Sequence, residues 1–182
     1  MNIFKVLASG KKSFPEETAS AVLAWLLNPQ MDHGLGYEFL RKFLTGLVNM
    51  LPKESPAHVG LSGLIEEKLD LALRASAVAP ADIRIELEKD VKSVHGSAFI
   101  DLVMYVDNFC FSIENKIYPT SAQDREQLLK QYEGIKEAHP QDRSIAHTVV
   151  IFLVPRRAEE DDARVTAEYD GLSLTSTPGP QV

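Results

Sequence analysis

The stretch that decides the fold is AFIDLVMYVDNFCFSIENKI, residues 98–117. It consists of two apolar runs, 98–106 and 109–117, with only Asp107 and Asn108 between them. Both residue types tolerate the left-handed backbone conformation that a tight hairpin turn requires. The stretch therefore predicts two antiparallel strands joined by a two-residue turn.

The register of this hairpin brings two acidic residues together. With a turn at Asp107-Asn108, Asp101 lies directly opposite Glu114, and opposed residues share one face of the sheet with Cβ atoms about 4.5–5.5 Å apart. Lys116 follows Glu114 by two residues and projects from the same face. Because like charges at this distance repel each other, the acidic pair needs a neutralising partner.

Two partners for the acidic pair stay open. A hard divalent cation would relieve the repulsion, and Lys116 could then hold an attacking water or stabilise developing negative charge. Alternatively, Lys116 itself neutralises the two acids in a structural charge cluster on a solvent-facing strand. The spacing of the residues agrees with both.

The segments on either side of the hairpin alternate between helical and extended patterns. Apolar spacings and prolines predict helices at 16–28, 37–51, about 62–78 and about 121–138. A period of two predicts a half-buried strand near 83–91, and the apolar run at 147–155 predicts a strand buried on both faces. Trp25 is expected in the core, and Pro56 is expected to help close the second helix. Three helices followed by β-β-β-α-β indicate an α/β protein with a mixed sheet.

Length and composition fit one globular domain. The chain has 182 residues, of which 45% are hydrophobic and 25% charged. We expect a single domain over 1–155, helical at 14–78 and with its core at 82–155, followed by an acidic flexible tail at 156–182. No apolar run reaches the length of a membrane span, and the single cysteine excludes an intrachain disulfide. These features predict a cytoplasmic protein with no membrane contact.

The net charge limits the ways in which the chain can bind an anionic partner. Lys and Arg number 19 against 26 Asp and Glu, which gives a formal net charge of −7. A protein that held nucleic acid by a broad basic surface would carry the opposite sign. We therefore expect weak, salt-sensitive, non-specific binding of nucleic acid by this chain alone.

Two motifs resemble one known family. Asp101 and the string Glu114-Asn115-Lys116 in adjacent strands resemble the core motif of the PD-(D/E)XK nuclease superfamily. The string SAVLAWLLNPQMDHGLGYEFLRKFL, residues 20–44, is similar to the helix-loop-helix of one branch of that superfamily. The resemblance covers about residues 14–155 and implies a restriction-endonuclease-like core.

The resemblance also implies roles for individual residues. Asp101 and Glu114 would bind Mg²⁺, with Mn²⁺ as a substitute, and Lys116 would be the catalytic lysine. The carbonyl of Asn115 would add a backbone contact to the metal. The family places a further metal-site acid on the first helix, at Glu16, whereas a register shift of one residue would select Glu17. The alternative for both is an acid that interacts favourably with the helix dipole.

The chain departs from the family pattern at two places. Relatives carry Gln-Leu-x-x-Tyr on the helix after the motif, whereas QLLKQY here separates Gln127 and Tyr132 by about 140° around the helix. Gln127 stays a candidate catalytic residue that can face the site together with Gln131, and Tyr132 is expected in the packing. The proline that often precedes the family aspartate is also missing.

The function expected from these residues is that of a Mg²⁺-dependent endo- or exonuclease that hydrolyses phosphodiester bonds in nucleic acid, with DNA as the first choice. A second copy of the chain or a partner protein could supply further substrate-binding elements. The alternative is a catalytically inactive module of the same fold that binds nucleic acid or protein. His33, in a loop with glycines, is expected to shape that loop rather than to act in catalysis.

Overall fold

The structure is a computed structural model that describes residues 16–74, 81–94, 96–115, 125–138, 145–153, 165–169 and 172–176. The helices are α2 (Glu16–Leu27), α3 (Glu38–Met50), α4 (Pro56–Leu64), α5 (Asp70–Arg74) and α6 (Arg125–Ala138). The strands are β1 (Ile83–Ser93), β2 (Gly96–Val106), β3 (Phe109–Asn115), β4 (His147–Leu153), β5 (Val165–Tyr169) and β6 (Leu172–Ser176). The predicted α/β order of helices followed by β-β-β-α-β is confirmed in these ranges.

The strands form one mixed sheet in the order β1-β2-β3-β4-β5-β6. Among the strands that the structure describes, only β3 and β4 pair in parallel, and α6 lies between them in the chain. The predicted hairpin is confirmed, because Val106 pairs with Phe109 and Asp107 adopts a left-handed φ of 50°. The turn therefore fixes the register of the two strands that carry the acidic pair.

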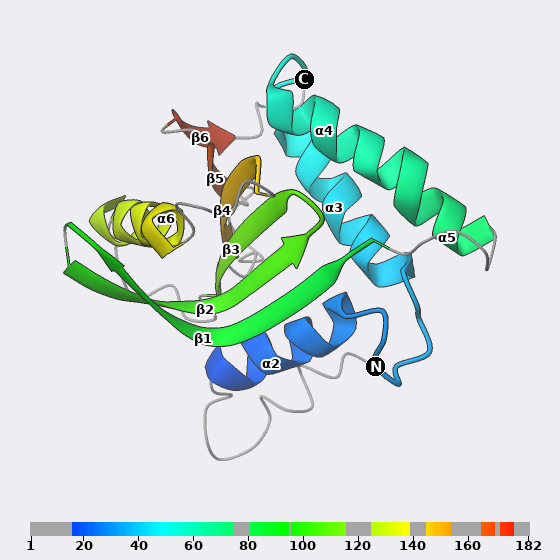
Figure 1. Cartoon of the computed structure of the whole chain (residues 1–182), viewed down its shortest axis with the longest axis horizontal. Helices are drawn as coiled ribbons and strands as arrows, with labels where there is room; N and C mark the ends of the chain where they lie inside the picture. The colour runs from blue at the N-terminus through cyan, green and yellow to red at the C-terminus, as the bar shows by residue number, and fades with distance from the viewer. Residues whose placement is uncertain are drawn as a thin grey trace, which may run out of the picture.

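Helices cover both faces of the sheet (Figure 1). The larger hydrophobic cluster joins α2, α3 and α4 to the side chains of Met104, Phe111 and Ile151. On the other face α6 packs through Ile135 on the β1–β2 hairpin. A Cβ atom at Gly134 would lie 2.8 Å from the side chain of Val91, so this glycine allows α6 its close approach to β1.

The third helical segment differs from the prediction. It begins at Pro56, where Ser55 caps the helix by accepting a hydrogen bond from the N–H of His58 at 3.1 Å. The expectation that Pro56 helps to close the preceding helix was wrong, because proline is favoured at the first position of a helix. A π-helical turn at Ile65–Leu69 then joins α4 to α5, and residues 75–78 of the predicted helix lie outside the described residues.

The region expected to be a flexible tail also differs from the expectation. Two strands within it, β5 and β6, extend the sheet beyond β4 as antiparallel neighbours. Their sequences, VTAEY and LSLTS, contain β-prone residues and alternate in polarity. Without β5, the edge of β4 would present unpaired backbone groups. Because residues 156–182 are rich in acidic residues, this region was expected to be a tail, although it contains these two short alternating segments.

Trp25 is not in the core, and that expectation was wrong. Its side chain is 40% exposed, its indole N–H donates to Asp32 at 3.1 Å, and its ring packs edge-on against His33. The indole N–H needs a hydrogen-bond acceptor, and Asp32 supplies one at the surface. His33 bonds to the carbonyl of Asn28 and accepts from the N–H of Leu35, so it shapes the loop as expected.

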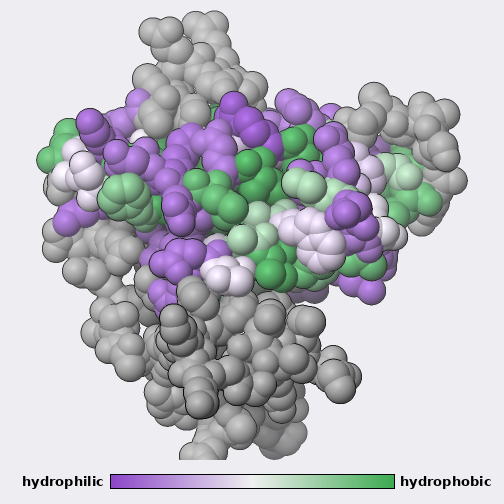
Figure 2. All heavy atoms as spheres, turned by 90° about the horizontal axis from the view of Figure 1, so that it is seen from below, coloured by the Kyte–Doolittle hydropathy of each residue, from purple (hydrophilic) through white to green (hydrophobic). Residues whose placement is uncertain are grey.

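The face of the molecule that carries α2 is seen in Figure 2, where a band of hydrophobic residues crosses a largely hydrophilic surface. Large side chains that are 40% exposed or more on and just after α2 include Trp25, Met31 and Leu35.

None of the helices in the described ranges is both long and apolar enough to cross a membrane.

In both β1 and β2, the alternation of side chains between the two faces of the sheet is interrupted at one position. Ile85 packs with the cluster under α2 and α3, whereas Val91 packs with the cluster under α6. On β2, Leu102 belongs to the first cluster and Ile100 to the second. Residues an even number apart on a regular strand share a face, so the strands twist abruptly between these positions.

The change of faces coincides with a gap in the β1–β2 pairing. Leu87 pairs with Leu102 and Lys89 with Ile100, whereas the register of the two strands skips the position of Glu88 and Asp101 between them. Glu88 adopts a left-handed φ of 51°, which is strained for a residue with a Cβ atom. The local strain is therefore located directly beside the aspartate of the predicted acidic pair.

The strain at Glu88 predicts an unusual order of stabilities. Glu88→Gly should be more stable than Glu88→Ala by about 1 kcal/mol, because glycine adopts positive φ without steric cost. At Asp90, an exposed residue of the same strand without positive φ, Ala should instead be the more stable of the two. Urea unfolding of the four variants measures both differences. Ala more stable than Gly at both positions would show that Glu88 carries no strain.

Candidate active site at the end of the β2–β3 ladder

The antiparallel pairing of β2 with β3 ends just before the predicted acidic residues. The paired register runs from Val106–Phe109 to Leu102–Ile113, and one further step of a regular ladder would place Asp101 opposite Glu114. In place of another backbone pair, the carboxylate of Asp101 accepts a hydrogen bond from the N–H of Asn115 at 2.8 Å. The side chain of Asp101 thus links β2 to β3 at the end of the ladder.

Glu114 lies at the same level of the sheet but contacts α6. Its side chain is 2% exposed and its carboxylate accepts a hydrogen bond from Nε2 of Gln131 at 2.8 Å. The same nitrogen donates to the carbonyl of Phe99 at 3.0 Å. Gln131 therefore joins β2 to β3 on the α6 side, while Asp101 joins them through the backbone of Asn115.

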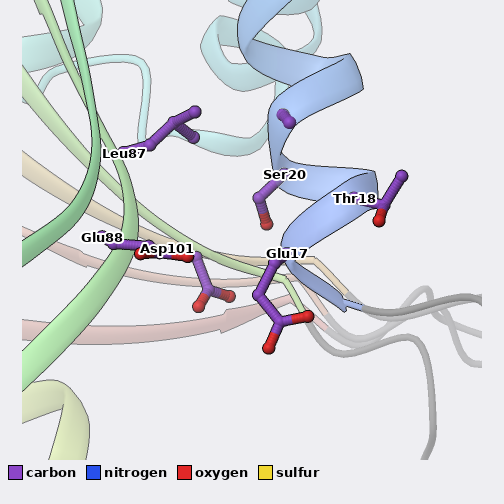
Figure 3. A pocket seen from close by; sticks show the side chains of 7 residues that line it. Glu17, Thr18, Ser20, Leu87, Glu88 and Asp101 are labelled. Atoms are coloured by element: carbon purple, nitrogen blue, oxygen red, sulfur yellow. The ribbon is translucent and has the colours of Figure 1, made fainter.

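A pocket of about 440 Å³ lies between the first helix and the change of faces in the β1–β2 hairpin. The residues that line it are Glu17, Thr18, Ser20, Ala21, Leu87, Glu88 and Asp101. Figure 3 shows Glu17 and Ser20 on α2, with Glu88 and Asp101 on the strands across from them. Three carboxylates and one buried hydroxyl thus border a single hollow.

The first helix contributes Glu17 to this pocket. The family resemblance favoured Glu16, which is not among the residues that line the pocket, and left Glu17 as the neighbour one residue away. Glu88 also lines the pocket, although its position in a polar alternation indicated an ordinary solvated strand face. Its backbone conformation, which turns it towards Asp101, has no signature in the sequence.

Two of the expected site residues, Lys116 and Gln127, are located here by their positions in the chain. Lys116 lies outside the described residues and directly follows Asn115, the last residue of β3. Gln127 lies in α6 one helical turn before Gln131. Sequence reasoning had placed Gln131 on the same helix face as Gln127, and Gln131 is the residue with an observed bond to Glu114. Tyr132 is buried against Val150 and Phe152, as expected.

Comparison with known proteins agrees with this architecture. A family model described as the PD-(D/E)XK nuclease superfamily matches residues 1–176 of the chain. A search of curated proteins finds no match to the sequence. The match includes the helices, the β2–β3 hairpin and both acidic residues at the end of its ladder.

The side chains at this site suit the divalent metal ion that such a family uses. Carboxylate oxygens are the ligands that Mg²⁺ and Mn²⁺ prefer, and Asp101 and Glu114 supply them from adjacent strands. Across the described ranges, no group of three or more His, Cys, Asp or Glu side chains is close enough to hold an ion. Mg²⁺ is commonly bound by one or two carboxylates together with waters and substrate phosphates, so the oxygen donors of Asp101 and Glu114 have the chemistry that such an ion requires.

The bond from Gln131 to Glu114 predicts a stability effect. Gln131→Ala should lower the free energy of unfolding by about 1.5–3 kcal/mol, because a buried carboxylate loses one of its donors. Glu137→Ala, on the exposed part of the same helix, should change it by less than about 0.5 kcal/mol. Urea unfolding compares the two. Equal effects would mean that the Gln131 bond does not stabilise the fold.

Proposed function

The chain belongs to the PD-(D/E)XK nuclease superfamily, and from this premise we propose that it is a Mg²⁺-dependent nuclease that cleaves DNA. The family implies nuclease chemistry on nucleic acid with a divalent metal. The observation that carries the more specific proposal is the end of the β2–β3 ladder, where Asp101 lines a pocket with Glu17 and Glu88 and the carboxylate of Glu114 on the neighbouring strand accepts from Gln131.

Each residue at the site has a proposed part in the reaction. Asp101 and Glu114 would hold the metal, with the carbonyl of Asn115 as a further ligand. An acid of the first helix would stand near the ion without binding it directly, because no three acidic side chains of the described residues lie close enough together to share one ion. Of the two acids considered, Glu17 has the better claim over Glu16 because it lines the pocket with Asp101. The bound metal would supply Lewis-acid activation of the phosphate and a more acidic water.

Other side chains of the protein orient the attacking water, stabilise negative charge and fix the two carboxylates. Lys116, next after Asn115, orients the attacking water or stabilises the negative charge that develops on the phosphate. Gln131 fixes the carboxylate of Glu114 through its hydrogen bond, and Gln127, one turn earlier in α6, is a further candidate for contact with the water. Asp101 is oriented by the N–H of Asn115.

Cleavage assays test the proposal. Single- and double-stranded DNA and RNA are incubated with the protein in Mg²⁺, Mn²⁺ or EDTA. We expect metal-dependent cleavage of DNA, lost by at least about 100-fold in Asp101→Asn, Glu114→Gln and Lys116→Met, because the first two remove the charge of a metal ligand and the third removes the cation that acts on the reacting phosphate. Asp90→Asn and Lys92→Met are matched controls, since they make the same changes at exposed positions of β1.

The outcomes separate the alternatives. Equal cleavage by the wild type and the three site variants would assign the activity to a contaminant or to other residues. Metal binding in calorimetry without cleavage of any substrate would indicate an inactive binding module. If Mg²⁺ and Mn²⁺ leave the melting temperature unchanged, the acids form a charge cluster without a metal, because a ligand that binds the folded state raises its stability.

A further inference from the structure

One polar group in the pocket has an unusual environment. The side chain of Ser20 is 2% exposed, and its hydroxyl has no hydrogen-bond partner among the described residues. A serine within a helix commonly bonds to a carbonyl of the preceding turn, and a buried hydroxyl without a partner is costly. Ser20 nevertheless lies in the wall of the pocket, opposite Asp101 (Figure 3).

The chemistry of the other groups that line the pocket limits the kind of ligand that this hydroxyl can bind. The carboxylates of Glu17, Glu88 and Asp101 accept hydrogen bonds when ionised, and Ala21 and Leu87 are apolar. Thr18 is exposed. Among the described side chains of the pocket, Ser20 therefore supplies the buried hydrogen-bond donor.

We propose that the Ser20 hydroxyl donates a hydrogen bond to a non-bridging oxygen of the DNA phosphate held in this pocket. This inference rests on the proposed nuclease function. A phosphate oxygen is an acceptor that satisfies the orphaned hydroxyl, and a metal ion held by Asp101 and Glu114 would offset the repulsion between the phosphate and the carboxylates of the pocket. Since Ser20 lies within the second turn of α2, its position is set by a helix packed on the sheet rather than by a loop.

The proposal predicts opposite effects on stability and on binding in Ser20→Ala. The melting temperature should stay the same or rise, because the variant removes a buried hydroxyl that has no partner in the free protein. DNA affinity, measured by fluorescence anisotropy with Ca²⁺ in place of Mg²⁺ to suppress cleavage, should fall about five- to tenfold. Ser20→Cys, which keeps the size but is a weak donor, should lose affinity in the same way.

Ser112 is the matched control. It is also a buried serine whose hydroxyl has no partner in the described structure, but it lies on β3 outside the pocket. Ser112→Ala should therefore have the same effect on the melting temperature as Ser20→Ala and no effect on DNA affinity.

Phosphorothioate DNA identifies the atom that Ser20 contacts. In oligonucleotides with Rp or Sp phosphorothioates, sulfur replaces one non-bridging oxygen and accepts hydrogen bonds poorly. With one of the two isomers, the affinity lost through Ser20→Ala should shrink towards zero, because the contact is already absent. A full loss with both isomers would overturn the phosphate contact.

Two further results have distinct meanings. A Ser20→Ala protein with a lower melting temperature and the DNA affinity of the wild type would show that the hydroxyl is structural, and this result would overturn the inference. The proposed nuclease function would still stand if the wild type showed metal-dependent cleavage. A wild type that neither binds nor cleaves DNA would contradict the proposed function and, with it, the role of Ser20.

Discussion

The carboxylate of Asp101, bonded to the N–H of Asn115, is the contact on which the site depends. It stands where backbone pairing between β2 and β3 has ended, and it takes the place of a carbonyl acceptor. A side chain can make such a link only if its strand turns it out of the regular alternation. The abrupt twist at Glu88 and Asp101 provides that turn, at the cost of a left-handed backbone at Glu88.

The same twist explains how one sheet can carry a polar site between two hydrophobic clusters. β1 packs through Ile85 on the cluster under α2 and α3 and through Val91 on the cluster under α6, and on β2 the residues that face α6 change from Val103 and Tyr105 to Ile100 and Ala98. The pocket opens at this level, between α2 and the β1–β2 hairpin. Gln131 and Asp101 bridge β2 and β3 with side-chain hydrogen bonds at that level, so the site is held although the ladder has stopped.

Much of this arrangement could be predicted from the sequence. The Asp107-Asn108 turn fixes the register by its length, so the level of Asp101 relative to Glu114 follows from counting residues. Counting could not reveal the change of faces, because it assumes a regular pleat, and for the same reason the alternating pattern of residues 83–91 does not distinguish Glu88 from its polar neighbours. Glu16 and Glu17 are adjacent on a helix, and only the packing of α2 distinguishes them. Ser20 belongs to the string that resembles the family, but the absence of a hydrogen-bond partner for its hydroxyl among the described residues is a property of the folded structure alone.

The central claim is that Asp101 and Glu114 bind one metal ion at the end of the ladder. A crystal structure with Mn²⁺, with the ion located by anomalous scattering, tests it most directly. The account predicts a single site with oxygen atoms of both carboxylates about 2.1–2.3 Å from the ion. A Lys116 ammonium group between the two carboxylates, or Mn²⁺ bound away from both, would contradict it.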